Sequence, residues 1–237
     1  MLSNLDFAID ALSVITASGL LIAGTTPPAQ APSVKSKAEK EADKAKGNGE
    51  PEDLIRKLGL TRLERIFHAL LLVLTALHIR SLWRANHGSG RSLELWVESK
   101  DQGRYRLACA LAAAGGAGRL WCYQTLGKSF TFDLAVQSGQ KVITTGPYAF
   151  VRHPSYTAIL VAVLGASFLH GPYAPYTTPA WRLAALILAV VNVTLTGALV
   201  VRRMDDEERM MLKSEQLGKD YLDYMVKTPS RLWPTAY

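Results

Sequence analysis

Several long runs of apolar residues restrict this chain to a small set of folds. A bilayer core is crossed by about 20 consecutive apolar residues in a helix. Lipid offers no hydrogen-bond partner to an open backbone group, so such runs cross it as helices. We therefore predict an all-α polytopic membrane protein of about five transmembrane helices. The expected spans are residues 5–24, 63–83, 105–123, 154–170 and 181–201.

The first apolar run and the polar segment after it predict the domain organisation. Asp6 and Asp10 interrupt the run, which leaves a spanning anchor, an interfacial helix or a poor signal sequence open. A signal sequence is the least expected, because no Lys or Arg precedes the apolar part. The next residues are rich in Pro, Ala, Lys and Glu and cannot bury enough surface to offset the entropy of ordering. We predict an N-terminal membrane helix at 1–24, a disordered cytosolic linker at 25–62 and a membrane domain at 63–237.

Charge predicts the orientation of the chain. The formal net charge is +7 and no basic patch is interleaved with stacking aromatic residues, which favours an anionic membrane surface over nucleic acid. The predicted linker holds eight Lys or Arg residues and the loop at 84–104 holds four. Because basic loops stay on the cytoplasmic side, the linker is expected in the cytosol. Counting spans then places residues 124–154 and 202–237 on the same side.

The cysteines and histidines of the apolar runs predict packing rather than chemistry. Cys109 and Cys122 lie in one predicted helix, about 20 Å apart, and are too distant for a disulfide. His68 and His78 share another helix and are expected to pack or to lie at the interface. No metal-binding motif is present in the sequence, and no metal is expected.

Residues Gly146–Tyr156, with the sequence GPYAFVRHPSY, form the first of two polar clusters beside apolar runs. Gly146 and Pro147 predict a turn, and Pro154 is placed to begin a helix. Arg152 and His153 would then lie at a helix N-terminus, which favours a carboxylate or phosphate. The alternative is that these two residues merely flank a span at the interface.

The second cluster, RMDDEE at residues 203–208, follows the last apolar run. Arg203 and Glu207 are four residues apart and share one helix face. They could equally be a snorkelling arginine paired with a surface glutamate. However, the two apolar runs between the clusters would form a helical hairpin that returns both clusters to one membrane face. We predict that they form a single site.

These motifs occur in a recognisable order. GPYAFVRHPSY, the hairpin, RMDDEE, LGKDYLDY at 217–224 and PSRLWP at 229–234 together resemble the isoprenylcysteine carboxyl methyltransferase family of class VI-like membrane methyltransferases. The resemblance covers about residues 105–237, the expected catalytic part, and suggests a fungal-type member. Phospholipid N-methyltransferases and sterol-type membrane reductases share the same elements, but the RLWP ending favours the carboxyl methyltransferases.

The resemblance implies S-adenosyl-L-methionine-dependent methyl esterification of the C-terminal prenylcysteine of CaaX-processed proteins, such as small GTPases. It implies a multi-pass protein of the endoplasmic reticulum membrane whose C-terminal half forms a cofactor site facing the cytosol. Two departures are the shorter segment from Gln137 to Val142, relative to animal members, and two additional residues between Glu208 and Gly218. The implied cofactor residues are Gln137, Gln140, Lys141, Val142, Ile143, Tyr148, His153, Pro154, Ser155, Tyr156 and Glu207.

The reaction implied by the resemblance requires little proton transfer. A prenylcysteine carboxylate is ionised at neutral pH and attacks a methyl group without a general base. The predicted catalytic residues are Arg203, which would also bind the substrate carboxylate, and Glu207. Glu207 would either stabilise a sulfonium cation or bind another polar part of the cofactor. Arg152 is the second choice for the carboxylate. The third and fourth spans are the nearest candidates to line a gap that admits the lipid.

Two other functions remain open at this point. The chain could be a related membrane methyltransferase that acts on a phospholipid amine or another small lipid, a substrate without a carboxylate for Arg203. It could also be a non-catalytic membrane scaffold that retains the fold.

Overall fold

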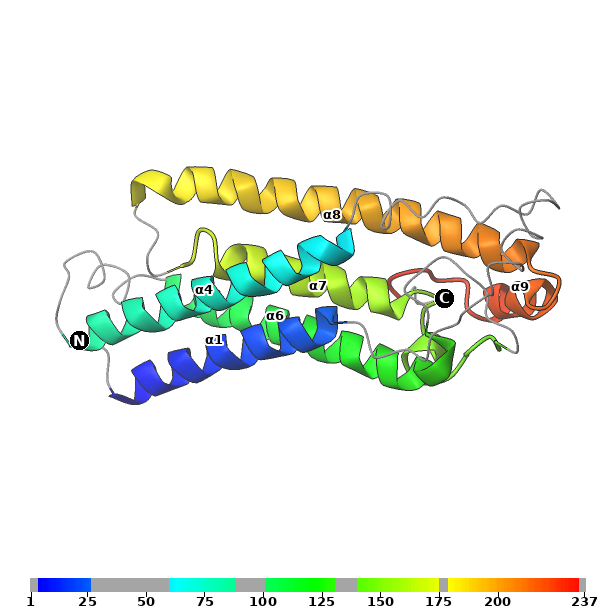
Figure 1. Ribbon diagram of the computed structural model, residues 1–237, viewed down its shortest axis with the longest axis horizontal. Helices are drawn as coiled ribbons and strands as arrows, with labels where there is room; N and C mark the ends of the chain where they lie inside the picture. Colours follow the sequence, from blue (N-terminus) through cyan, green and yellow to red (C-terminus); the bar gives the residue numbers. More distant parts are fainter. Residues whose placement is uncertain (1–3, 27–59, 88–100, 131–139, 175–178, 235–237) are drawn as a thin grey trace. The chain divides into compact units, whose positions relative to one another are not determined.

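The computed structural model describes residues 4–26, 60–87, 101–130, 140–174 and 179–234. Within these ranges the chain is helical and contains no β-strand, so the predicted all-α class is confirmed (Figure 1). Two short 3-10 helices, Gly127–Ser129 (η1) and Gly146–Ala149 (η2), accompany the α-helices. The α-helices are α1 (Asn4–Thr25), α4 (Leu60–Asn86), α6 (Asp101–Leu126), α7 (Pro154–Leu169), α8 (Pro179–Lys213) and α9 (Gly218–Lys227).

Each of the five predicted spans coincides with a helix. In the described part of the chain, α1, α4 and α8 are long and apolar enough to cross a membrane. Helix α7 is apolar but has only 16 residues. Helix α6 is not among the candidate spans; it combines three arginines with many small residues. The prediction of a polytopic membrane protein is confirmed, whereas most of the predicted linker lies outside the described residues.

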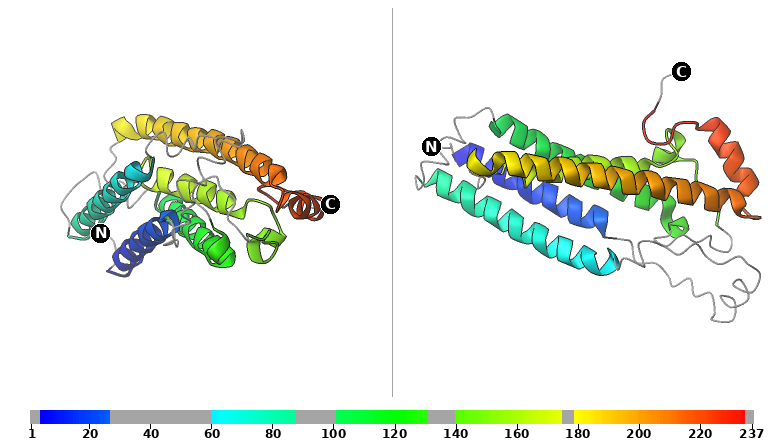
Figure 2. Two further views of the ribbon diagram at one scale, coloured as in Figure 1. Left: turned by 45° about the vertical axis from the view of Figure 1, so that its right-hand side comes forward. Right: turned by 90° about the horizontal axis from the view of Figure 1, so that it is seen from above.

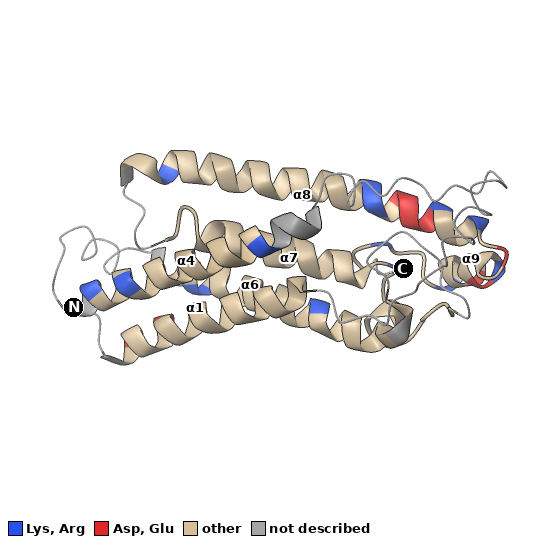
Figure 3. Cartoon of the chain, in the orientation of Figure 1, with Lys and Arg blue, Asp and Glu red and all other residues tan. Residues whose placement is uncertain are grey.

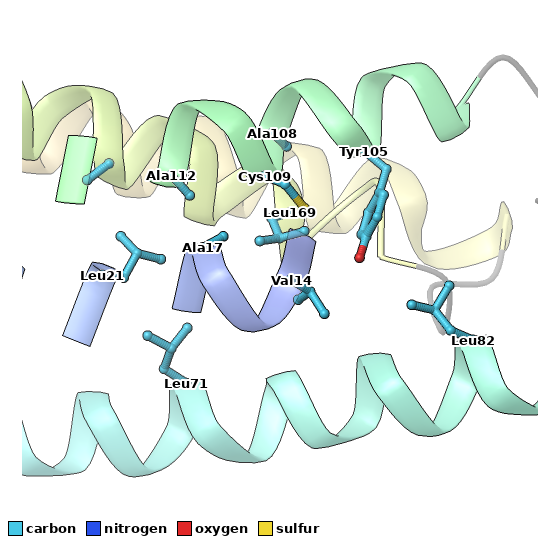
Figure 4. Close-up of a cluster of buried hydrophobic side chains, with 11 residues drawn as sticks. Val14, Ala17, Leu21, Leu71, Leu82, Tyr105, Ala108, Cys109, Ala112 and Leu169 are labelled. Atoms are coloured by element: carbon cyan, nitrogen blue, oxygen red, sulfur yellow. The ribbon is translucent and has the colours of Figure 1, made fainter. Parts of the chain in front are cut away.

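The structure divides into two compact units. The first is made of Met1–Thr26, Ile66–Leu120 and Ser155–Val200, and the second of Pro27–Arg65, Trp121–Pro154 and Val201–Tyr237. Of the second unit, the structure describes residues 60–65, 121–130, 140–154 and 201–234. The core of the first unit is a cluster of buried apolar side chains from α1, α4, α6 and α7. In Figure 4 the side chains of α1 lie between α4 and α6, with Tyr105 of α6 pointing toward α1.

The two aspartates in the first apolar run are paired with α6. Asp10 is fully buried, and its carboxylate accepts hydrogen bonds from Arg106 Nε at 2.7 Å and Gln102 Nε2 at 3.1 Å. The other end of the Arg106 guanidinium contacts Asp6 at 3.1 Å. Ionisable groups within membrane helices are expensive unless paired in this way. The acids therefore attach α1 to the bundle, and α1 has the length of a span.

Glycines bring α6 and α7 into backbone contact. A Cβ added to Gly115 would lie 2.3 Å from the backbone nitrogen of Ala162, and one added to Gly165 would lie 2.3 Å from that of Ala112. Small residues permit this approach within lipid, where close packing replaces the hydrophobic drive between helices. The two helices therefore leave no space between them at these positions. The gap that was expected to admit the lipid substrate beside the third and fourth spans does not lie here.

Replacing Gly115 with alanine is expected to destabilise this contact. The new methyl group meets backbone atoms that cannot rotate away, and overpacking of this kind costs about 1–3 kcal/mol. Gly103→Ala on the same helix is the matched control, because a Cβ there meets nothing within 4 Å. Thermal unfolding of the two purified variants in detergent measures the difference. Equal midpoints for both variants would contradict the proposed close contact.

The histidines and cysteines of the helices behave as predicted. His68 forms a hydrogen bond with Thr25 at 2.8 Å. The His78 ring is buried and contacts the rings of Tyr105 and His170, with centroids 5.8 and 4.9 Å apart. The two cysteines are free and buried. The two histidines join helices of the first unit by packing and hydrogen bonds.

Helix α8 continues well past its apolar part. It is an unbroken helix of 35 residues, seen from two further directions in Figure 2. At 1.5 Å per residue it is roughly 50 Å long, whereas a bilayer core is about 30 Å thick. Charged residues gather in the segment that begins at Arg202 (Figure 3). This charged end of α8 therefore extends beyond the hydrocarbon.

Candidate active site

The turn before α7 is built as its sequence predicts. Gly146 has a φ of +59°, a conformation that favours glycine, and it begins the 3-10 helix η2. The hydroxyl of Tyr224 on α9 donates to the carbonyl of Tyr148 at 2.6 Å and holds this turn in place. Helix α7 begins at Pro154, as expected from the missing amide proton of proline. Arg152 and His153 are consequently fixed just before a helix N-terminus, and both are buried.

A buried carboxylate, Glu208 of α8, organises the second unit. Its Oε1 accepts hydrogen bonds from Arg152 Nε at 3.0 Å and lies 2.9 Å from His153 Nε2. Its Oε2 accepts from Arg231 Nη2 at 2.5 Å. The side chains of Arg152, His153 and Glu208 are each only 7% exposed. A carboxylate removed from water is stable only with such partners, so this group is a structural anchor as well as part of the site.

Glu207, the preceding residue, connects the two polar clusters. Its Oε1 accepts a hydrogen bond from Arg203 Nε at 3.2 Å, and its Oε2 lies 3.7 Å from His153 Nδ1. The two nitrogens of the His153 ring therefore face two different carboxylates of α8. The side chains of Arg203 and Glu207 are 13% and 27% exposed, so both are less enclosed than Glu208. The two clusters meet, as the sequence predicted.

The segment after α9 completes the network. The backbone amides of Arg152 and His153 donate to the carbonyls of Ser230 and Arg231, both at 2.9 Å. The Arg152 guanidinium also donates to the carbonyl of Thr228 at 2.9 Å. The side chain of Arg231 contacts two carboxylates of α8, Asp205 at 2.8 Å and Glu208 at 2.5 Å. The end of the chain thus holds the turn before α7 by both backbone and side-chain contacts.

Opposite charges are matched around Glu207 and Glu208. Three guanidinium groups face three carboxylates, those of Asp205, Glu207 and Glu208. Hydrogen bonding to Glu208 and Asp205 raises the pKa of Arg231 above its already high ordinary value, so this group stays charged. Burial raises the pKa of Tyr224 to about 12, which keeps its hydroxyl protonated as a donor to Tyr148.

The other predicted cofactor residues have different surroundings. The carbonyl of Gln140 accepts a hydrogen bond from Gln216 at 2.9 Å, and the stretch up to Ile143 is partly or fully exposed. Gln137 lies outside the described residues. Ser155 and Tyr156 belong to the first unit, where Arg119 donates to the Ser155 hydroxyl at 3.1 Å. The second unit brings His153 and Glu207 together with Arg203, and the same unit contains Tyr148, which bonds Tyr224.

Two residues of the network, Glu208 and Arg231, were not predicted as members of the site. Both occur in motifs that the sequence reveals, RMDDEE and RLWP, but no local spacing relates them. The second choice for the substrate carboxylate, Arg152, is not supported. Its guanidinium is buried and bonded to Glu208 and to the carbonyl of Thr228, so its donors serve the fold. The side chain of Arg203 is 13% exposed and that of Arg152 is 7% exposed. Arg203, the first choice from the sequence, is therefore the more accessible of the two.

Comparison with known proteins identifies a family match for one segment of the chain. No curated protein matches the chain significantly. Residues 107–213 match a protein family, over just under half of the chain. The matched segment includes the turn before α7 and both glutamates of α8, whereas Arg231 lies beyond it. The family is the isoprenylcysteine carboxyl methyltransferase (ICMT) family, so the resemblance noted in the sequence is confirmed as a match over residues 107–213.

Proposed function

We propose that the protein transfers a methyl group from S-adenosyl-L-methionine to the C-terminal carboxylate of a prenylcysteine in CaaX-processed proteins. The observation that carries this proposal is the meeting of His153 with Glu207 and Arg203 inside the family-matched segment. That meeting supplies an arginine and a carboxylate side by side. The arginine suits the anionic carboxylate of the acceptor, and the carboxylate suits the cationic sulfonium of the methyl donor.

Arg203 is the proposed ligand of the substrate carboxylate. Its guanidinium can orient a carboxylate by two parallel hydrogen bonds, a geometry that lysine cannot offer. The hydrogen bond to Glu207 on the next helical turn fixes its direction. Because the carboxylate is already ionised at neutral pH, no residue has to remove a proton. Catalysis then depends on alignment of the reactants and exclusion of water.

The residues of the second unit fit a sulfonium cofactor by their chemistry. When bound, S-adenosyl-L-methionine supplies an electrophilic methyl group. Glu207 is a partly exposed carboxylate suited to a cationic or hydroxylic part of the cofactor, while Glu208 is already saturated by its own partners. By the sequence resemblance, the proposed binding residues also include Gln137, Tyr148 and the stretches 140–143 and 153–156. In the described part of the chain, no group of three or more metal-ligating side chains is present.

The proposed location is the endoplasmic reticulum membrane, with the site on the cytosolic side. The apolar helices α1, α4 and α8 support a membrane location. A prenyl chain gains about 0.8 kcal/mol for each methylene buried in lipid, so its carboxylate is presented at the membrane surface. The charged end of α8, which extends beyond the hydrocarbon, is suited to meet it there.

A transfer assay tests the proposal. Microsomes that contain the chain are given labelled S-adenosyl-L-methionine with either N-acetyl-farnesylcysteine or phosphatidylethanolamine, and microsomes without the chain are the control. We expect base-labile label on the farnesylcysteine. Label in the phospholipid instead would assign the related lipid methyltransferase. Absence of label from both, with the protein present in the membrane, would favour a scaffold and reject the proposal.

A further inference from the structure

We propose that Arg231 is a positioning residue for the methyl-donor site, although it lies outside the family-matched residues 107–213. The inference rests on the proposed function and adds a residue to it. The Arg231 side chain contacts Asp205 and Glu208, neither of which is a proposed cofactor or substrate ligand. It acts through Glu208, and the chain segment around it holds His153.

The first support is the geometry at Glu208. Arg231 donates from Nη2 to Oε2 at 2.5 Å, and its Nε lies 3.2 Å from each carboxylate oxygen. The guanidinium therefore grips the carboxylate with two nitrogens. A forked contact fixes the orientation of a carboxylate, whereas a single point charge does not. The same carboxylate oxygen that bonds Arg152 also lies 2.9 Å from His153 Nε2, so its orientation sets the direction of the imidazole.

The second support is independent of the side chain of Arg231. Its own carbonyl accepts the amide hydrogen of His153, and the neighbouring carbonyl of Ser230 accepts that of Arg152. The segment thus holds the backbone of His153 while the guanidinium holds the carboxylate that faces its ring. The backbone and the ring of His153 are therefore both positioned by the segment at residues 230–231.

The effect reaches the proposed reaction centre by contacts already described. The second ring nitrogen of His153 lies 3.7 Å from Glu207, which in turn bonds Arg203 at 3.2 Å. A tilt of the imidazole would alter the surroundings of Glu207. Arg231 itself is 37% exposed, and Glu208 keeps two buried partners without it. Loss of Arg231 should therefore misalign the donor site more than it unfolds the protein.

The test compares Arg231→Gln and Arg231→Lys with the wild type in the full-length protein. Equilibrium binding of S-adenosylhomocysteine, initial rates with N-acetyl-farnesylcysteine and thermal unfolding are measured on each. The Gln variant is expected to raise the KM for the methyl donor and the Kd for S-adenosylhomocysteine by about 10- to 100-fold, since small misplacements cost up to about 100-fold. The KM for farnesylcysteine should change less than about twofold. The Lys variant keeps the positive charge but cannot make the forked contact, so its donor KM and its Kd for S-adenosylhomocysteine should lie between those of the wild type and the Gln variant.

Arg209→Gln is the matched control, because Arg209 lies on the same helix as Glu208 with a side chain 73% exposed and should behave as the wild type. The inference fails if the wild type is active and Arg231→Gln retains donor binding. It also fails if both KM values rise together in proportion to the loss of folded protein, which would indicate a structural role alone. A wild type that neither binds S-adenosylhomocysteine nor methylates farnesylcysteine refutes the proposed function, and this inference with it.

Discussion

Glu208→Gln is expected to destabilise the protein by about 3–5 kcal/mol, the cost of removing one partner from a buried ion pair. The substitution preserves the size of the side chain but leaves the guanidinium of Arg152, only 7% exposed, without a negative partner. It also weakens the contacts with His153 and Arg231. We expect the thermal midpoint in detergent to fall by roughly 10 °C. Methyl transfer should be lost with the fold of the second unit.

Asp206→Asn is the matched control for this variant. Asp206 lies two residues away on the same helix, is 40% exposed and contacts Arg209 only at 4.0 Å. An exposed pair of this kind contributes about 0–1 kcal/mol, so the midpoint should change little. If both isosteric variants unfold at the wild-type temperature, Glu208 is not the anchor that its contacts indicate.

Arg203→Ala is expected to lower kcat/KM for N-acetyl-farnesylcysteine by about 100-fold or more, because the acceptor carboxylate loses its orienting group. Binding of S-adenosylhomocysteine should weaken much less. Arg203→Lys should recover only part of the activity, since it cannot form two parallel hydrogen bonds with a carboxylate. The pair with Glu207 is of the i,i+4 kind and contributes about 0.3–0.5 kcal/mol, so the variant should remain folded. Initial rates over a range of acceptor concentrations give the measurement.

Arg202→Ala serves as the comparison for Arg203. It removes the same charge from the adjacent position of the same helix, where the side chain is exposed. If the two alanine variants lose activity equally, the effect is one of general charge, and Arg203 is not the specific ligand of the carboxylate. Unchanged kinetics in Arg203→Ala would remove it from the reaction altogether.

The helices could be predicted from the sequence because their signals are local. The apolar runs predicted α1, α4, α6, α7 and α8, and Pro154 predicted the start of α7. The ends of α6 and α8 were less accessible, since both helices continue into charged or polar residues without a break. The aspartates of α1 looked like interruptions because Arg106, which pairs with them, lies almost a hundred residues later.

Part of the candidate site could be predicted for the same reason. Arg203 and Glu207 are linked by the period of a helix, and the hairpin returned His153 to them. The role of Glu208 could not be read in this way. Its partners lie 56 and 23 residues away in sequence, at positions 152 and 231, and only the folded chain brings them together. Of two adjacent glutamates, a sequence cannot indicate which one turns inward.

The contact between Gly115 and the backbone of α7 has a consequence for how a lipid substrate travels. Where the main chains of α6 and α7 are in contact, no space remains between the two helices. A prenyl tail could pass there only if the helices separated. We expect the tail to slide in along some other boundary of the first unit. Bulky replacements at exposed positions of α6, such as Leu107, should then leave the uptake of farnesylcysteine unimpeded.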